Sequence, residues 1–158
     1  MPDAWRIVPH HRVASAFDGE GARLFGGRWN APGRPAVYTA ESRALAALEV
    51  LVHLTPESSR RRFALIRIRL PQDAIAGPDG GVPRSHAVSA QIHPDTQRAG
   101  DAWLASRETP ALRVPSAVVP GEFNFLLNPL HPAFGGLKAD EPEPFAFDPR
   151  LLPEAGAD

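Results

Sequence analysis

A single glutamate stands in an otherwise apolar stretch of the chain. Residues 42–54 read S-R-A-L-A-A-L-E-V-L-V-H-L. At about 100° per residue, the apolar side chains cover most of a helical circumference, while Ser42, Glu49 and His53 share one narrow stripe. A helix that is apolar nearly all round is expected to be buried. An ionised carboxylate there is costly unless it is paired, and catalysis or ligand binding is the usual reason for one.

A glycine-rich segment, Gly26-Gly27-Arg28-Trp29-Asn30, is the second candidate. Two glycines allow a tight turn or a close approach of the backbone to a ligand. Arg28 could present its guanidinium to a phosphate or carboxylate, and Trp29 could offer a stacking face. An ordinary turn would explain the same residues. The chain has neither the Lys-Ser or Lys-Thr of a P-loop nor the glycine pattern of a Rossmann fold.

Three further polar residues fall on expected strands. Tyr38, the only tyrosine, is either a core aromatic or a flat surface for a ring-bearing ligand, with a hydroxyl that fixes the ligand's orientation. Ser116 falls on the apolar face of a strand expected at 111–119, where it either binds a backbone carbonyl or has a function. Asn124 borders an apolar run, and satisfaction at a strand end is its default role. The Gly-x-Ser-x-Gly motif typical of serine hydrolases is missing.

The histidines do not indicate a metal site. The six lie at 10, 11, 53, 86, 93 and 131, with no pair at i, i+4 and no cysteine in the chain. We therefore predict no metal.

The composition is that of a globular protein. With 158 residues, 43% hydrophobic and 22% charged, we predict one domain over residues 1–150 and a frayed tail over 151–158. The net charge of −1 argues against nucleic acid as the main partner. The chain contains no window of about 20 apolar residues, so we expect no membrane span. The chain shows no secretory signal, and the absence of cysteine fits a cytoplasmic protein.

Hydrophobic periodicity predicts short strands mixed with few helices. We expect an ordered loop or flap over 14–33, turns over 72–83, and a second helix over 95–107 that is capped by Asp95 or Thr96. The expected strands cover 5–8 (an edge strand), 36–39, 63–70, 111–119, 122–127 and 145–147. Because strands and helices do not alternate regularly, we predict a single compact α+β domain.

Four motifs, taken in this order, resemble the RES domain family. They are G-G-R-W-N-A-P-G, A-V-Y-T-A, A-L-E-V-L-V-H and V-P-S-A-V-V-P-G-E-F-N-F-L-L-N-P-L-H-P, and the resemblance runs from about Trp5 to Arg150. It implies a fold similar to that of the ADP-ribosyltransferases. The family contains toxins of bacterial type II toxin–antitoxin systems that consume NAD and are usually neutralised by an Xre-type antitoxin.

By this resemblance, Arg28, Tyr38, Glu49 and Ser116 match the active-site positions of the family. Cleavage of the nicotinamide–ribose bond develops positive charge on the ribose, and we expect Glu49 to stabilise that charge. Arg28 would bind the pyrophosphate or an adjacent anion and keep Glu49 ionised. Tyr38 would stack on the nicotinamide, and Ser116 would orient the ribose or the amide.

We also assign Trp29 and Asn124 to substrate binding. The expected activity is that of an NAD glycohydrolase or NAD phosphorylase, with water or phosphate as acceptor, NAD as substrate and no cofactor. Transfer of ADP-ribose to a protein, or nucleotide binding without turnover, are the alternatives. The balanced charge argues against a ribonuclease. An Xre-type antitoxin is expected to cover the active site, and a homodimer is compatible with the family.

Overall fold

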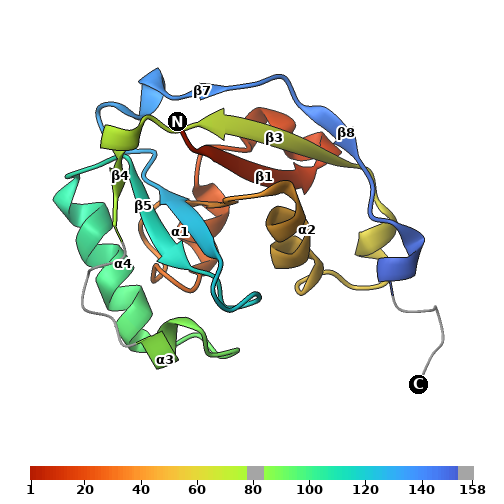
Figure 1. The fold of residues 1–158 in the computed structure, drawn as a ribbon, viewed down its shortest axis with the longest axis horizontal. Helices are drawn as coiled ribbons and strands as arrows, with labels where there is room; N and C mark the ends of the chain where they lie inside the picture. Colours follow the sequence, from red (N-terminus) through yellow and green to blue (C-terminus); the bar gives the residue numbers. More distant parts are fainter. Residues whose placement is uncertain (78–83, 153–158) are drawn as a thin grey trace.

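One mixed sheet organises the molecule. The computed structural model describes residues 1–77 and 84–152, and Figure 1 shows the sheet with α2 and α4 against it. Within these residues the strand order is β4-β5-β6-β2-β1-β3-β7, and β8 also pairs with β3. All pairings are antiparallel except that of β4 with β5. The strands are β1 Asp3–Pro9, β2 Val37–Ala40, β3 Phe63–Arg69, β4 Ile75–Ala76, β5 Ala111–Pro115, β6 Phe123–Leu127, β7 Lys138–Ala139 and β8 Glu143–Phe145.

The helices lie over different parts of the sheet. Helix α2 packs against β1 and β2, whereas α4 lies along the half that contains β5 (Figure 1). The α-helices are α1 Glu20–Phe25, α2 Arg43–Leu51, α3 Arg84–Ala87 and α4 Pro94–Ser106. Short 3-10 turns cover His10–Ser15, Ser58–Arg60, Gln72–Ala74, Phe134–Gly136 and Pro149–Leu151. Within the described ranges, no helix combines the length and the apolar character that crossing a membrane requires.

The sheet has a seam between β1 and β2. These strands are in register at one pair, Trp5 opposite Ala40. By contrast, β1 pairs with β3 along its whole length, from Asp3 opposite Arg69 to Pro9 opposite Phe63. The sheet therefore consists of two well-paired halves, β4-β5-β6-β2 and β1-β3-β7, that diverge from their one shared pair.

Alternation along β3 explains why both faces of its half are covered. Phe63 and Leu65 pack beneath α2, while Ala64 and Ile66 pack on the opposite face. The predicted strand over 63–70 is thereby confirmed. The predicted fold class, a single compact mixed domain, is also confirmed.

The apolar sequence of α2 predicted a helix that is buried on all sides, but the structure buries only part of it. Its N-cap is Ser42, whose hydroxyl accepts the amide of Leu45 at 3.0 Å. Leu45 is buried against the sheet, but Leu48 is 37% exposed and Val52, just after the helix, is 59% exposed. The prediction was wrong because only one side of the helix meets the sheet, and nothing in the described chain covers the other.

Several other local predictions were also wrong. The strand expected at an edge is β1, which has partners on both sides because β2 and β3 each pair with it. The segment 14–33, expected to be a loop, contains α1. Helix α4 is capped by His93, one residue before Pro94, instead of Asp95 or Thr96. Strand β5 ends at Pro115 and β8 at Phe145, each before the predicted end. Residues 78–83 and 153–158, part of the predicted turns and tail, lie outside the described residues.

Gly100 tests the packing of α4 against the segment that carries Arg28. A Cβ atom at Gly100 would lie 1.7 Å from the carbonyl oxygen of Trp29. We expect Gly100→Ala to lower the free energy of unfolding by about 1–3 kcal/mol or more, because the backbone must move apart. Urea denaturation measures this change. Gly135→Ala is the control, since a Cβ there has nothing within 4 Å. Equal stability of the two variants would contradict the close packing.

Candidate active site

The carboxylate of Glu49 is held by two hydrogen bonds to one of its oxygens. Its Oε1 accepts the hydroxyl of Ser116 at 2.6 Å and the side-chain amide of Asn124 at 2.7 Å. Glu49 comes from α2, whereas its partners come from the end of β5 and from β6. Among the described residues, Oε2 accepts no hydrogen bond. The glutamate is therefore fixed at one oxygen and free at the other.

The hydroxyl of Ser116 donates one hydrogen bond and accepts two, all within the protein. Ser116 is completely buried and lies just beyond β5, not within a longer strand as predicted. Its Oγ accepts the backbone amides of Val118 at 3.1 Å and Val119 at 3.0 Å. Because both amides point at the oxygen, the hydroxyl hydrogen is left to be donated to Glu49. The serine thus positions the carboxylate, and its predicted role of orienting the ribose or amide stays a prediction.

Asn124 lies beside Ser116 and has one unused polar atom. Its Nδ2 donates to Glu49, while its Oδ1 is buried and has no hydrogen-bond partner among the described residues. A buried carbonyl oxygen without a partner costs stability. Asn124 therefore holds Glu49 in place at a cost in stability. In this structure its amide nitrogen binds Glu49, and its contact with a substrate stays a prediction.

Arg28 lies near enough to this carboxylate to interact with it electrostatically. Burial lowers the pKa of Arg28, and the negative charge of Glu49 opposes that decrease. No ion pair joins the two residues within the part of the chain that the structure describes. Instead, the guanidinium donates long hydrogen bonds to the carbonyls of Gln91 at 3.3 Å and Ala90 at 3.5 Å. The predicted interaction of Arg28 with Glu49 is therefore electrostatic, without an ion pair in the described part of the chain.

Tyr38 supports the segment that carries Arg28. Its hydroxyl accepts the backbone amide of Trp29 at 3.0 Å and donates to Oδ1 of Asn30 at 2.6 Å. Burial raises the pKa of Tyr38 far above its ordinary value, so the phenol stays neutral. Both hydrogen bonds of this hydroxyl are internal, so its use to orient a ligand stays a prediction. The ring remains a candidate stacking surface.

Trp29 is not a stacking surface. It is 5% exposed and packs in the cluster that contains Trp103 and Leu126. Its ring is therefore not open to a ligand in this structure, and its assignment to substrate binding stays a prediction. A tryptophan beside two glycines looks like part of a ligand-binding loop, but here its ring anchors that loop to the core.

Sequence analysis missed the residues of α4 that fasten this segment. The hydroxyl of Thr96 donates to the carbonyl of Arg28 at 2.6 Å, and Gln97 donates to that of Gly27 at 3.1 Å. Asn30 is fully buried and donates to the carbonyl of Ala22 at 2.8 Å. The glycine at position 27 was the one feature of the sequence that could have indicated this close packing. The structure shows why, because a Cβ there would lie 2.6 Å from the hydroxyl of Tyr38. A glycine was therefore required at that position.

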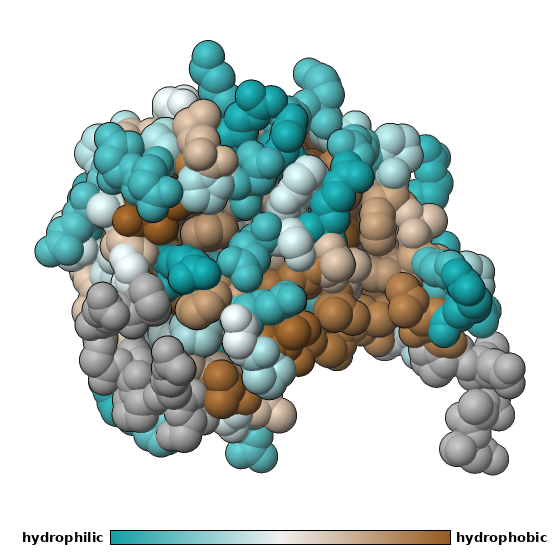
Figure 2. Space-filling model, viewed as in Figure 1, coloured by the Kyte–Doolittle hydropathy of each residue, from teal (hydrophilic) through white to brown (hydrophobic). Residues whose placement is uncertain are grey.

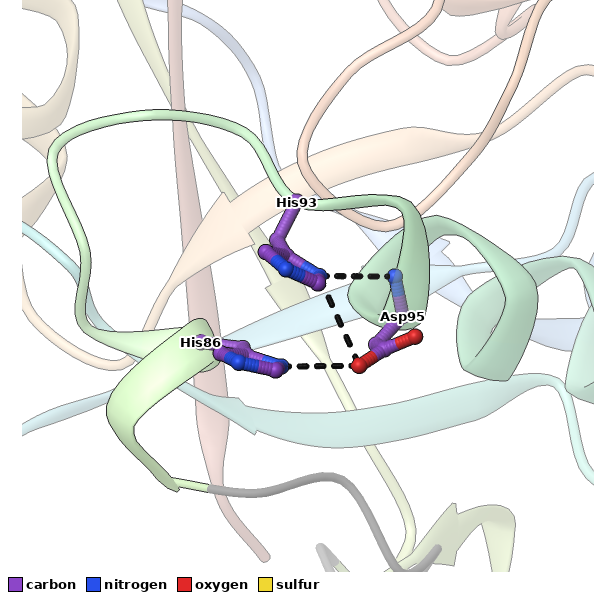
Figure 3. A group of neighbouring side chains, drawn as sticks. All are labelled: His86, His93 and Asp95. Carbon is purple, nitrogen blue, oxygen red and sulfur yellow. Dashed lines mark hydrogen bonds and ion pairs between the residues drawn. The ribbon is translucent and has the colours of Figure 1, made fainter.

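One cluster of side chains near α4 has metal-ligating chemistry. His86, His93 and Asp95 each offer a ligand atom, and these atoms lie within 4.8 Å of one another (Figure 3). The two imidazole rings are stacked, with centroids 3.6 Å apart and planes 15° from parallel. Stacked rings direct their nitrogen lone pairs nearly parallel, whereas ligands of one metal must converge on it. The arrangement therefore fits an ion pair and helix cap better than a metal centre.

Taken together, the site can stabilise positive charge next to a bound anion. The free oxygen of Glu49 is a preorganised negative charge, and Arg28 is a partly exposed cation nearby. Such preorganised groups act more strongly where water is partly excluded. The arrangement suits a substrate that carries phosphate and forms a cationic centre during reaction.

Comparison with known proteins identifies relatives over almost the whole chain. The family model described as RES domain matches residues 3–148. A "Prs ADP-ribosylating toxin" of Sphingobium sp. (strain YBL2) is 38% identical over 156 residues, which is 96% of this chain and 97% of that protein. A "Toxin Res" of Yersinia enterocolitica is 40% identical over 151 residues, 93% of this chain and 97% of that protein.

A solved structure shares the fold. The crystal structure of the M. tuberculosis MbcT-MbcA toxin–antitoxin complex superposes with a TM-score of 0.74 at 24% identity. The match covers 92% of this chain and 84% of that chain. At this identity the likeness establishes the architecture alone.

Tyr38→Phe tests the structural role of the hydroxyl. The change removes the hydrogen bonds of the tyrosine hydroxyl to the Trp29 amide and to Oδ1 of Asn30, so we expect the free energy of unfolding to fall by about 1–3 kcal/mol. Chemical denaturation measures this loss. Ser15→Ala, which removes an exposed hydroxyl, is expected to change stability by less than about 0.5 kcal/mol. A Tyr38→Phe protein as stable as the wild type would show that these two bonds do not hold the segment.

Proposed function

Because this chain belongs to the RES domain family, we propose that it is the toxin of a type II toxin–antitoxin pair and that it degrades NAD. The reaction is cleavage of the bond between nicotinamide and ribose. The observation that carries the proposal is the Glu49 carboxylate, held at Oε1 by Ser116 and Asn124 with Oε2 unoccupied. The toxin names of its relatives support the biological role.

The chemistry follows from the charges of the site. As the bond from C1′ to the nicotinamide nitrogen breaks, its electron pair leaves with the base and the ribose becomes an oxocarbenium-like cation. Glu49 stabilises that cation through Oε2, and its charge cannot drift because the other oxygen is anchored. Arg28 binds a phosphate of the dinucleotide. The ring of Tyr38 stacks against the nicotinamide. Water or phosphate then bonds to C1′ and releases a proton to solvent. NAD is the substrate, and the proposal includes no metal or cofactor.

ADP-ribosylation of a protein is the second candidate. The relative at 38% identity is called an ADP-ribosylating toxin, and the bond that breaks is the same. Only the acceptor differs, because a protein nucleophile replaces water at C1′. Nucleotide binding without turnover is the non-enzymatic alternative, and a preorganised carboxylate with a free oxygen speaks against it.

An antitoxin of the Xre type is the proposed partner, and it would cover the active site. Figure 2 shows apolar side chains gathered over α2, where Leu48 and Val52 are exposed. Exposed apolar surface of this kind is typical of protein interfaces. It lies on the element that carries Glu49, so a protein bound there would cover the site. A homodimer is compatible with the same surface, and consumption of NAD places the proposed action in the cytoplasm.

The test is nicotinamide release from NAD by purified protein, with and without phosphate. We expect the wild type to release nicotinamide and Glu49→Gln to be slower by about 100-fold or more, because the stabilising charge is lost while its anchoring oxygen is kept. Glu141→Gln, an exposed position, is the control. Expression without antitoxin should stop growth for the wild type but not for Glu49→Gln. No release by the wild type, with either acceptor, would overturn the proposal.

The acceptor is identified in a second experiment. NAD labelled in its adenylate portion is incubated with the protein and a cell extract, and the products are separated by size. Label in free ADP-ribose or its phosphate ester indicates hydrolysis or phosphorolysis. A labelled protein band that is absent with Glu49→Gln indicates transfer to a protein.

A further inference from the structure

A short segment between α3 and α4 lies against Arg28. It covers residues 89–92, S-A-Q-I, and we call it the strap. The guanidinium of Arg28 donates from Nη1 to the carbonyl of Gln91 at 3.3 Å and from Nη2 to the carbonyl of Ala90 at 3.5 Å. The mechanism above gives this guanidinium to a phosphate and gives the strap no role. The same two nitrogens therefore have two prospective partners.

The strap has few other attachments. Within residues 1–77 and 84–152, the bonds from Arg28 are the only hydrogen bonds that join it to the rest of the protein. The backbone amide of Gln91 binds inside the strap, to the hydroxyl of Ser89 at 3.2 Å. Ile92 is 52% exposed, so packing does little to replace the missing bonds. The middle of the strap is held chiefly by Arg28.

The two ends of the strap are held together by side chains outside the proposed mechanism. His86 on α3 and His93 just before α4 stack with their ring centroids 3.6 Å apart (Figure 3). A carboxylate oxygen of Asp95 lies 2.8 Å from Nδ1 of His86, and His93 accepts the backbone amide of Asp95 at 3.1 Å. The strap is thus a short loop with joined ends and a weakly held middle.

A phosphate is a stronger partner for Arg28 than the strap is. The two carbonyl distances lie beyond the usual N–H···O range of about 2.7–3.2 Å. Bonds from a guanidinium to phosphate are shorter and stronger because both groups are charged, and they form in parallel pairs. Burial lowers the pKa of Arg28, so its charge gains from a bonded anion. A phosphate that reaches both terminal nitrogens is therefore expected to displace the carbonyls.

We propose that the strap and the phosphate of the substrate exchange places at Arg28. In the free protein the carbonyls of Ala90 and Gln91 hold the guanidinium. Phosphate binding takes the guanidinium over and releases the strap. Because the carbonyl bonds must break first, the strap lowers the affinity for substrate. This inference rests on the proposed function, since it uses the contact between Arg28 and phosphate.

The first test measures the mobility of the strap. The chain has no cysteine, so Gln91→Cys accepts a single nitroxide label while the backbone carbonyl is kept. We expect inorganic pyrophosphate to make the label more mobile in electron paramagnetic resonance spectra. Adding Arg28→Met should give the mobile spectrum without pyrophosphate and remove the response. A label on Glu141→Cys, an exposed position between β7 and β8, is the control and should not respond.

The second test measures the cost of the carbonyl bonds to substrate binding. Two glycines inserted between Gln91 and Ile92 lengthen the strap and loosen its hold on Arg28. We expect KM for NAD to fall by about threefold or more with little change in kcat, because weaker bonds remain to be broken. The same insertion between Glu141 and Pro142 is the matched control. A strap that instead positions Arg28 for the substrate would raise KM when it is loosened.

The outcomes separate this inference from the proposed function. A label that pyrophosphate does not mobilise, a label unaffected by Arg28→Met, or a higher KM after the strap insertion would each overturn the exchange. None of these results touches NAD cleavage, which nicotinamide release measures independently. If NAD is not cleaved, the proposed function fails, and the response of the label to pyrophosphate alone then decides the exchange.

Discussion

Two hydrogen bonds to one oxygen of Glu49 are the constraint on which the site depends. They join α2 to the β5–β6 half of the sheet, since Ser116 and Asn124 are 67 and 75 residues away along the chain. Other contacts fix the position of each donor. Two backbone amides bind the serine hydroxyl, and the asparagine lies in the paired strand β6. The carboxylate therefore has a fixed position and one unused oxygen. This is the condition for electrostatic stabilisation without reorganisation at the moment of reaction.

The second requirement is that Arg28 be held near that carboxylate without pairing with it. A direct ion pair would neutralise both groups and fill the space that a substrate needs. The structure avoids it by fastening the backbone around Arg28 from two sides. The hydroxyl of Tyr38 binds the next residue, and the hydroxyl of Thr96 binds the carbonyl of Arg28 itself. Gly27 and Gly100 permit these contacts because a Cβ at either would collide with a neighbour. The guanidinium then interacts with Glu49 electrostatically.

The divergence of β1 from β2 opens the sheet beside Arg6. A fully paired sheet would leave no opening at this position. With one residue pair in register, the two halves separate, and Arg6 bridges them by binding a carbonyl on β2. The apolar face of α2 has a comparable origin. The helix packs on one half of the sheet and leaves Leu48 exposed, so the element that carries Glu49 also presents apolar surface.

Local patterns were sufficient for part of this description. The alternation over 63–70 predicted β3, and the mixture of short elements predicted the α+β class. The carboxylate in an apolar stretch drew attention to Glu49, which the structure holds by two hydrogen bonds. These inferences depend only on neighbours in the sequence, whose periodicity is set by backbone geometry. The partners of each polar atom depend on residues far apart in the chain. Trp29 proved to be buried, and the hydroxyls expected to face a ligand proved to bind Glu49 and a backbone amide. Residue type determines which hydrogen bonds a side chain can make, but only the packing of distant elements decides which of them it does make, because a buried polar group takes whatever partner the fold brings to it.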